Sequence, residues 1–458
     1  MPKHVIVLGA GISGLSAAWR LSDNGIKVDV LEAEPFAGGL AGTVRDGNYS
    51  LDFGPHSFFS EDQGIVDAVL RLFDNKLQPK SRDVKFYYRG KYIDYPLTAK
   101  SVLFDMGFCS GIQASWSFLK SRLFPCKRVA LEGEDETVEE WAIASFGEYL
   151  YRIFFKPYSE QFWKTPCSEL SSRCIPTHTR MSFINTLKLL LHKKVSKNKD
   201  SLIEREILPT YYPDTGFGEI AERIVKKIEK NQGRVHLACE VVGITELPNK
   251  KILISYKHNG QYKKMEGDYI ISTLPLPPLI KMLKASVPQE VLASADKLDY
   301  QSLVLLGIVT HKKDILNSGY VYQLNKPYNR ISEMNNFSPN TSPAEENIIT
   351  VEITCSKDST AWAATKEELF DICIGGLAED GFLGLGDVKR LFLIKAQYAY
   401  PIYRKDYAAH LRKTMDYLKT CRSLTTLGRC GEFMYMDIDK CMRRAFDFVD
   451  DNIKEFRD

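Results

Sequence analysis

Three glycines near the start of the sequence have the spacing of a phosphate-binding loop. Gly9, Gly11 and Gly14 form a Gly-x-Gly-x-x-Gly motif, which also contains Ser13. The first glycine permits a tight turn, the second lets the backbone approach a pyrophosphate, and the third allows a helix to pack closely on a strand. Glu32 follows at about 20 residues, where a carboxylate accepts hydrogen bonds from ribose hydroxyls. We therefore expect these residues to bind a dinucleotide cofactor.

The segments around this motif are those that would position it. The apolar runs His4 to Leu8 and Lys27 to Leu31 are typical of buried parallel strands, and the second run ends at Glu32. Between them, Ser16 to Leu21 continues the motif as a helix that ends at Asn24-Gly25. The N-terminus of such a helix offers unpaired N–H groups to phosphates. This complete order of elements favours a nucleotide site over a glycine turn without a ligand.

A second glycine group indicates which dinucleotide is bound. Gly38-Gly39-Leu40-Ala41-Gly42-Thr43 follows Glu32 closely. It resembles the second glycine motif of the large flavoenzyme class that includes the amine oxidases and protoporphyrinogen oxidase. The resemblance implies that the cofactor is FAD, with Gly38, Gly39 and Leu40 among its contacts. Leu40 stands where that class often carries an arginine.

The composition is that of a globular protein. The chain has 458 residues, of which 44% are hydrophobic and 26% are charged, enough for roughly two to three domain-sized units. A net charge of +3 does not indicate a nucleic-acid-binding surface. The ten cysteines include no Cys-x-x-Cys pair, and none of the eight histidines shows metal-ligand spacing with them. We therefore expect reduced thiols, no zinc site and a cytoplasmic location.

One apolar segment raises the question of membrane contact. Met106 to Leu119, between Asp105 and Lys120, is shorter than the roughly 20 apolar residues that cross a bilayer. We expect no transmembrane segment, and we favour a buried or substrate-side helix there, with lipid contact as the alternative. No signal peptide is predicted, because a strand follows His4 directly.

The order of predicted elements is that of an α/β protein with discontinuous domains. Strand-like runs occur between residues 234 and 272 and between 303 and 394, with hairpin signals at Pro248-Asn249 and Asn259-Gly260. Gly216-Phe217-Gly218 follows a loop, so we expect it to lead into a helix and not to bind a second nucleotide. A last helix is predicted from about Met436 to Lys454. The predicted domains are a Rossmann-type FAD-binding domain (1–60, 205–285 and 396–458), a helical insert (61–204) and an antiparallel-sheet substrate domain (286–395).

The most specific motif lies near the C-terminus. Gly428-Arg429-Cys430-Gly431-Glu432-Phe433-Met434-Tyr435-Met436-Asp437-Ile438-Asp439 is similar, without a gap, to the closing motif of UDP-galactopyranose mutase. Gly54-Pro55-His56 likewise resembles the mutase motif whose histidine lies near the flavin. The resemblance implies that FAD is contacted by Gly428, Arg429, Asp437 and Asp439.

Segments in the middle of the chain resemble the same family. Tyr158-Ser159-Glu160-Gln161-Phe162-Trp163 is similar to its uridine-binding segment, and Tyr400-Pro401-Ile402 and Pro327-Tyr328-Asn329-Arg330 are similar to segments that grip the diphosphate. Arg180 falls near a second diphosphate arginine, one residue out of register, and Val241 would touch the adenine end of FAD by analogy. The resemblance implies a catalytic set of His56, Arg330, Tyr400 and Tyr435. It implies a substrate-binding set of Tyr158, Trp163, Arg180, Arg330, Tyr400 and Tyr435.

These residue types suit a sugar nucleotide as the substrate. A diphosphate requires a fixed cation and hydroxyl donors, which Arg330 would supply as a charge-assisted fork and Tyr400 and Tyr435 as neutral phenols. Tyr158 and Trp163 could stack on a base. In the mutases, reduced FAD is the nucleophile that captures the anomeric carbon, so the protein's task is to orient the substrate and stabilise charge.

Two departures keep other functions open. Phe59 stands where the mutases usually carry a second histidine, and Phe86 to Pro96 looks like relatives that are often labelled generically as flavin oxidoreductases. The alternative is an oxidoreductase of the amine oxidase and protoporphyrinogen oxidase type, which the aromatic stretch from Phe104 to Phe124 would suit. A non-catalytic, FAD-stabilised binding protein is the third hypothesis. The expected partner is a small molecule, and a homodimer is left open.

Overall fold

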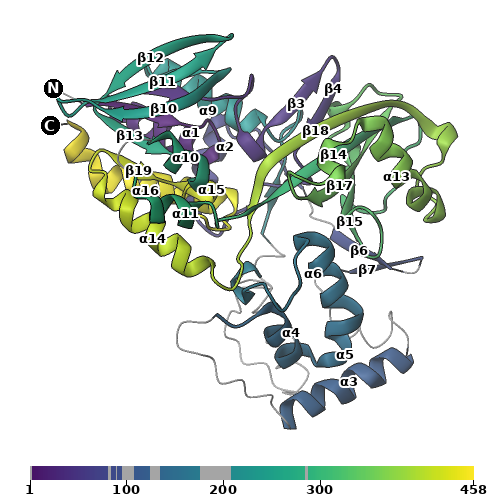
Figure 1. Ribbon diagram of the computed structural model, residues 1–458. Coiled ribbons are helices and arrows are strands. Elements are labelled where there is room, and N and C mark those ends of the chain that lie inside the picture. The colour runs from purple at the N-terminus through teal and green to yellow at the C-terminus, as the bar shows by residue number, and fades with distance from the viewer. Residues whose placement is uncertain are drawn as a thin grey trace.

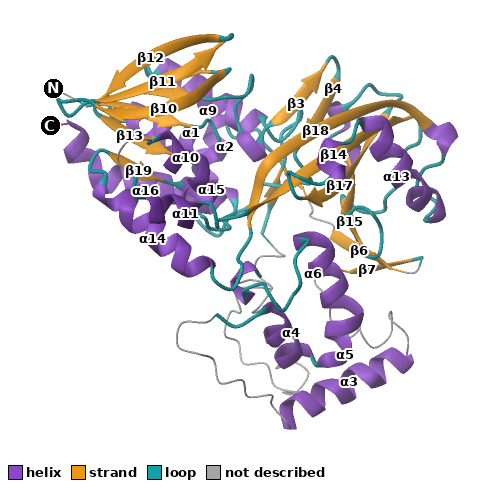
Figure 2. Cartoon of the chain, in the orientation of Figure 1, coloured by secondary structure: helices purple, strands orange, loops and turns teal. Residues whose placement is uncertain are grey.

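The computed structural model describes residues 3–80, 84–88, 90–94, 108–123, 135–175, 208–283 and 287–457. Two large sheets organise this part of the chain, one on each side of the upper half of Figure 1, and a group of helices lies below them. Figure 2 shows the same separation, with the strands gathered above and mainly helices below.

The first strand forms the centre of a five-stranded parallel sheet. Strand β1 (His4–Leu8) pairs with β2 (Lys27–Leu31) on one side and with β13 (Tyr269–Ser272) on the other. The edge strands are β9 (Arg234–His236) and β19 (Leu424–Thr426). Side chains alternate between the two faces of a strand, and Val5 to Leu8 are all buried, so both faces of this sheet must be covered.

The two faces are covered by different elements. Val5 and Val7 belong to a core formed with three helices, α1 (Ile12–Asp23), α9 (Glu219–Lys230) and α16 (Ile438–Arg457). Ile6 and Leu8 face an antiparallel sheet of β10 (Cys239–Glu246), β11 (Ile252–His258) and β12 (Gln261–Gly267). That second core also contains α10 (Leu276–Met282), α11 (Gln289–Ala295) and α14 (Tyr407–Thr420). The hairpins predicted at Pro248-Asn249 and Asn259-Gly260 and the helix predicted after Gly218 are confirmed.

The second large sheet has seven strands in the order β18-β14-β17-β16-β15-β6-β7. Its three longest strands are antiparallel neighbours: β18 (Val388–Pro401) at one edge, then β14 (Tyr300–Thr310) and β17 (Asn347–Cys355). Helices α12 (Thr360–Ala363) and α13 (Lys366–Glu379) pack against it. The opposite face of the sheet is covered by a hairpin of β3 (Thr43–Asp46) and β4 (Tyr49–Asp52). Leu51 on β4 and Phe53 just after it pack against this face.

One part of the region predicted as helical forms strands instead. Residues 84–94 make a hairpin, β6 (Val84–Tyr88) and β7 (Lys91–Asp94), and β6 pairs in parallel with β15 (Tyr320–Gln323). β15 in turn pairs with β16 (Arg330–Glu333), so the hairpin extends the sheet that was predicted from residues 286–395. The cause is the β-branched and aromatic composition of residues 84–93, which favours strands. The short strands β5 (Pro79–Lys80) and β8 (Thr210–Tyr211) also pair.

The remaining α-helices lie outside the two large sheets. They are α2 (Gln63–Leu72), α3 (Phe108–Leu123), α4 (Val138–Phe146), α5 (Glu148–Leu150), α6 (Lys156–Trp163) and α15 (Gly428–Gly431). Thr137 and Glu140 form a capping box at the start of α4. Within the described ranges, none of the helices combines the length and the apolar character that crossing a bilayer would require.

Candidate functional site

A cavity of about 1410 Å³ runs between the parallel sheet and the seven-stranded sheet. Its walls come from the loop after β1, the end of β2, the start of β10, helix α6, strand β18 and the segment from Arg429 to Cys441. These elements are far apart in sequence, so the site exists only in the folded chain. A cavity of this size exceeds the roughly 300–1,000 Å³ of ordinary ligand pockets and has room for a large cofactor together with a substrate.

The glycine turn forms one end of the cavity. Gly9 has a φ of +98°, and a Cβ on Gly14 would lie 2.1 Å from the Gly9 carbonyl oxygen, so both positions require glycine. Gly11 behaves differently, because a Cβ there would meet no atom within 4 Å. Gly11 and Ser13 line the cavity, and no described side chain caps the N-terminus of α1. The open space and the unpaired N–H groups fit a pyrophosphate.

Glu32 lies beside this turn at the end of β2 and lines the cavity. Its carboxylate accepts from the backbone N–H of Ala10 at 2.6 Å and of Glu34 at 2.9 Å, and burial raises its pKa. These bonds hold the carboxylate in place at the wall. Val241, on β10, is buried at the same end of the cavity. Both residues therefore lie at the end of the cavity that the glycine turn forms.

The second glycine group packs directly on the first. The Gly38 N–H donates to the Ala10 carbonyl at 2.8 Å, and a Cβ on Gly39 would lie 3.2 Å from the Gly11 Cα. Leu40 lines the cavity and packs in the apolar cluster of Leu51 and Phe53. At the position where the flavoenzyme class often has an arginine, this chain thus presents an apolar wall.

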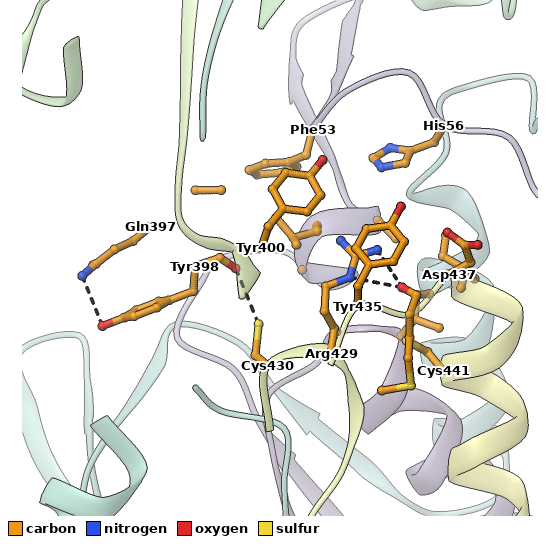
Figure 3. A pocket seen from close by; sticks show the side chains of 18 of the residues that line it. Phe53, His56, Gln397, Tyr398, Tyr400, Arg429, Cys430, Tyr435, Asp437 and Cys441 are labelled. Carbon is orange, nitrogen blue, oxygen red and sulfur yellow. Dashed lines mark hydrogen bonds between the residues drawn. The ribbon is translucent and has the colours of Figure 1, made fainter. Parts of the chain in front are cut away.

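The closing motif lies beside the first glycine turn, because Gly428 packs against Ser13. Arg429 donates to the Met436 carbonyl from Nε at 3.1 Å and from Nη2 at 2.7 Å. Its guanidinium lies 4.8 Å from the centre of the Tyr435 ring and 5.5 Å from that of Tyr400, as Figure 3 shows. Asp437 also lines the cavity.

Two of the motif residues predicted to contact FAD, Gly428 and Asp439, do not line the cavity. The position of a Gly428 Cβ lies only 2.2 Å from the Ser13 hydroxyl, so Gly428 seats the motif against α1. Asp439 accepts a hydrogen bond from the Ser60 hydroxyl at 2.8 Å. The structure therefore places Asp439 in a contact between α16 and the loop before α2, and not at the cavity wall where a direct FAD contact was predicted.

His56 is a half-buried residue of the cavity wall. Burial and the positive charges of Arg330 and Arg429 lower its pKa to about 3. The ring stacks on Phe217 with centroids 5.1 Å apart, and its Nδ1 has no hydrogen-bond partner among the described residues. A buried polar atom without a partner, at a cavity wall, is suited to a bond with a ligand.

Arg330 is held by a buried carboxylate that the sequence did not reveal. Its Nε and Nη2 donate to both oxygens of Glu352 at 3.0, 2.7 and 2.5 Å, and the Glu352 side chain is only 2% exposed. Burial alone would lower the pKa of Arg330, but Glu352 raises it well above its usual value. The guanidinium also lies 5.7 Å from the ring centres of Tyr320 and Tyr322. Arg330 therefore presents a positively charged side chain, held in a fixed position, at the cavity wall.

The aromatic residues predicted to bind substrate meet beside Arg330. The rings of Tyr400 and Tyr435 stack with centroids 6.2 Å apart, and burial raises the pKa of both phenols, so they donate as neutral groups. Trp163, at the end of α6, lies 6.4 Å from Tyr400. Tyr158 lies one turn earlier on α6 and 5.6 Å from Tyr322. Arg180 lies outside the described residues.

Comparison with known proteins places this site in a family. Residues 12–390 match the family model described as flavin containing amine oxidoreductase. The chain belongs to this family. It is an FAD-dependent flavoenzyme. The two glycine groups, the uncapped N-terminus of α1 and the fixed side chain of Arg429 fit that cofactor.

Curated relatives include both mutases and oxidases. A probable UDP-galactopyranose mutase of Klebsiella pneumoniae is 27% identical over 172 residues, 37% of this chain and 43% of the relative. A dTDP-fucopyranose mutase of Escherichia coli is 24% identical over 35% of this chain and 42% of the relative. An L-amino-acid oxidase of Gloydius halys is 43% identical over 84 residues, 18% of this chain and 16% of that oxidase. The matches thus span less than half the length of these relatives.

Solved structures match over almost the whole chain. Reduced UDP-galactopyranose mutase gives a TM-score of 0.79 at 21% identity, covering 99% of this chain and 96% of that one. A putative protoporphyrinogen oxidase from Exiguobacterium gives 0.75 at 14% identity, covering 99% of both chains. At these identities the likeness establishes the mixed α/β fold.

Proposed function

We propose that this flavoenzyme rearranges a nucleotide-linked sugar with reduced FAD and no net redox change, as its resemblance to UDP-galactopyranose mutase implies. The observation that carries the proposal is the convergence of His56, Arg330, Tyr400, Arg429 and Tyr435 on one part of the cavity wall. This wall combines two fixed cations with neutral phenols and a neutral imidazole. Such a set binds a diphosphate without placing a protein nucleophile beside the sugar.

The adenosine and pyrophosphate parts of FAD would be held by the parallel-sheet domain. In this proposal the sheet and α1 form a Rossmann-type unit, with Gly11, Ser13 and Gly39 around the pyrophosphate and Glu32 and Val241 at the adenosine. Arg429 and Asp437 would contact the flavin. The sheet draws its strands from residues 4–31, 234–272 and 424–426, which supports the proposed discontinuous domain.

Each substrate-facing residue has a separate task in this proposal. Arg330 would pair with a phosphate, and the Tyr400 and Tyr435 hydroxyls would donate hydrogen bonds to the same group. Tyr158 and Trp163 would hold the base against α6. When bound, reduced FAD supplies the nucleophile, and the aromatic walls keep water away from the sugar.

A specific observation favours an oxidoreductase as the second candidate. Arg330 is already paired with both oxygens of Glu352, so the charge of this cation is balanced before any substrate binds. A less anionic substrate, such as an amine or another oxidisable C–N or C–C compound, would suit a balanced pair better than a diphosphate. The family match to amine oxidoreductases supports the same alternative.

An anaerobic titration separates the two candidates. The purified holoenzyme, oxidised or reduced with dithionite, is titrated with UDP-hexoses and then with amines, while flavin absorbance and products are followed. Turnover of a UDP-hexose only by the reduced enzyme, with the flavin still reduced at the end, supports the mutase. Bleaching of oxidised flavin by amines, with reduced flavin unaffected by UDP-hexoses, rejects the mutase and supports the oxidoreductase.

A further inference from the structure

Helix α3 carries a continuous apolar stripe on its outer side. The stripe consists of Ile112, Trp116, Leu119 and Leu123, which are 55%, 69%, 47% and 64% exposed. These residues are three or four positions apart, so they lie on one face of the helix. In Figure 1, α3 is the lowest helix, away from both sheets.

The stripe is not the face by which α3 holds to the rest of the protein. Ala114, on another face, is 3% exposed, and the Ser117 hydroxyl accepts from the Tyr149 N–H at 2.9 Å. A Cβ on Gly147 would lie 2.7 Å from the Phe118 backbone nitrogen, so the two backbones touch. Helix α3 is therefore seated firmly on α4 and α5, and the stripe is left over after that packing.

Exposed apolar side chains elsewhere in the described residues are scattered. Tyr262, Ile372, Leu385 and Met434 are comparably exposed, but they lie on separate elements. Single exposed apolar residues are normal on protein surfaces, whereas a contiguous group marks an interaction site. The stripe on α3 is thus the feature that requires a partner.

The charge of the surrounding sequence indicates the partner. Between Asp105 and Glu132 the charged residues are all basic: Lys120, Arg122, Lys127 and Arg128. A basic segment combined with an apolar helix face that includes a tryptophan matches the chemistry of an anionic bilayer surface. A second copy of this chain fits less well, because the stripe has four residues, whereas a stable protein interface has roughly 20–30 residues a side.

We propose that α3 lies in the headgroup region of an anionic membrane, with Ile112, Trp116, Leu119 and Leu123 inserted. Helix α4, which packs on α3, contributes Val138 and Trp141 to the cavity wall. Docking through α3 therefore brings the helical side of the cavity next to the bilayer while the parallel sheet stays in water. The proposal places the enzyme at a membrane surface, and it does not depend on which reaction the enzyme catalyses.

Vesicle co-sedimentation of the holoenzyme tests the proposal. The wild type is compared with the double variant Trp116→Ser, Leu119→Ser on vesicles of phosphatidylcholine and on an equimolar mixture with phosphatidylglycerol. The matched control is Ile372→Ser, Leu385→Ser, which removes two equally exposed apolar residues elsewhere. Flavin content and circular dichroism establish that each variant is folded.

The expected result is binding that is stronger on the anionic vesicles and at least about tenfold weaker for the α3 variant, since each lost side chain removes buried apolar area. The control should bind like the wild type. Absence of wild-type binding, or equal loss in the control, would overturn the proposal. Light scattering without vesicles provides a further test, because a dimer that the α3 substitutions dissociate would assign the stripe to a second copy of the chain.

Discussion

Removing the Arg330 side chain should destabilise the protein as well as weaken substrate binding. Glu352 is 2% exposed, and the hydrogen bonds from Arg330 are what compensate its burial. In Arg330→Ala the carboxylate would lose this partner. Breaking a buried pair from one side costs about 3–5 kcal/mol, whereas replacing both members by neutral groups of similar volume is close to neutral. The double variant Arg330→Met, Glu352→Gln should therefore recover most of the lost stability.

Thermal melting of the wild type, Arg330→Ala and the double variant measures this difference. The single variant should melt several degrees lower than the wild type, and the double variant should melt close to the wild type. On the fraction that remains folded, a UDP titration should show affinity lower by about 1.5–3 kcal/mol, with unchanged flavin content. A single variant that melts within about one degree of the wild type would refute the buried-pair reasoning. Unchanged UDP affinity would remove Arg330 from the phosphate site.

Three further predictions concern the cofactor and pH. Gly11→Val should give a folded but colourless protein, because the side chain clashes with no protein atom yet fills the space before the glycine turn; the ratio of flavin to protein absorbance tests this. His56 should stay neutral in nitrogen NMR spectra down to mildly acidic pH. Since its folded pKa of about 3 lies below the ordinary 6.5, protons bind the unfolded state first and stability falls as pH drops below 6.5, a slope that His56→Phe should reduce. Asp29→Asn should lower the melting temperature at neutral pH. Burial disfavours the charged Asp29 carboxylate, but hydrogen bonds from two histidines outweigh burial and lower its pKa. The carboxylate therefore stabilises the fold above pH 3.8, the ordinary pKa of an aspartate, and this stabilisation is lost as the pH falls further. The wild type and this variant should converge in strong acid, and parallel curves would contradict that account.

Local sequence signals predicted the nucleotide end of the site well. His4–Leu8 and Lys27–Leu31 coincide with β1 and β2, because each is a short apolar run bounded by glycine turns. The last helix was less well bounded, beginning at Ile438 and ending at Arg457. Helix ends depend on caps and fraying that a periodic pattern does not specify.

The substrate end could be predicted only in part. The motif containing Arg330 was visible, but its partner Glu352 is brought opposite it by the register of β16 on β17. That register follows from the packing of the whole sheet, which no local pattern encodes. The same applies to residues 84–94: their composition favours strands, but their pairing with the edge of β15 follows from the fold. Tyr320 and Tyr322 reach the cavity through this arrangement and had no motif to identify them.

The central position of β1 has a consequence for the order of assembly during synthesis. Strand β1 is translated well before its neighbour β13, and β19 and the segment around Arg429 follow later still. Until then β1 and β2 form an incomplete sheet, and the glycine turn lacks the closing motif that packs beside it. The cavity is therefore complete only after the segment around residue 429 has been translated. A supply of free FAD, or protection of the exposed early strands, should consequently limit the yield of holoenzyme.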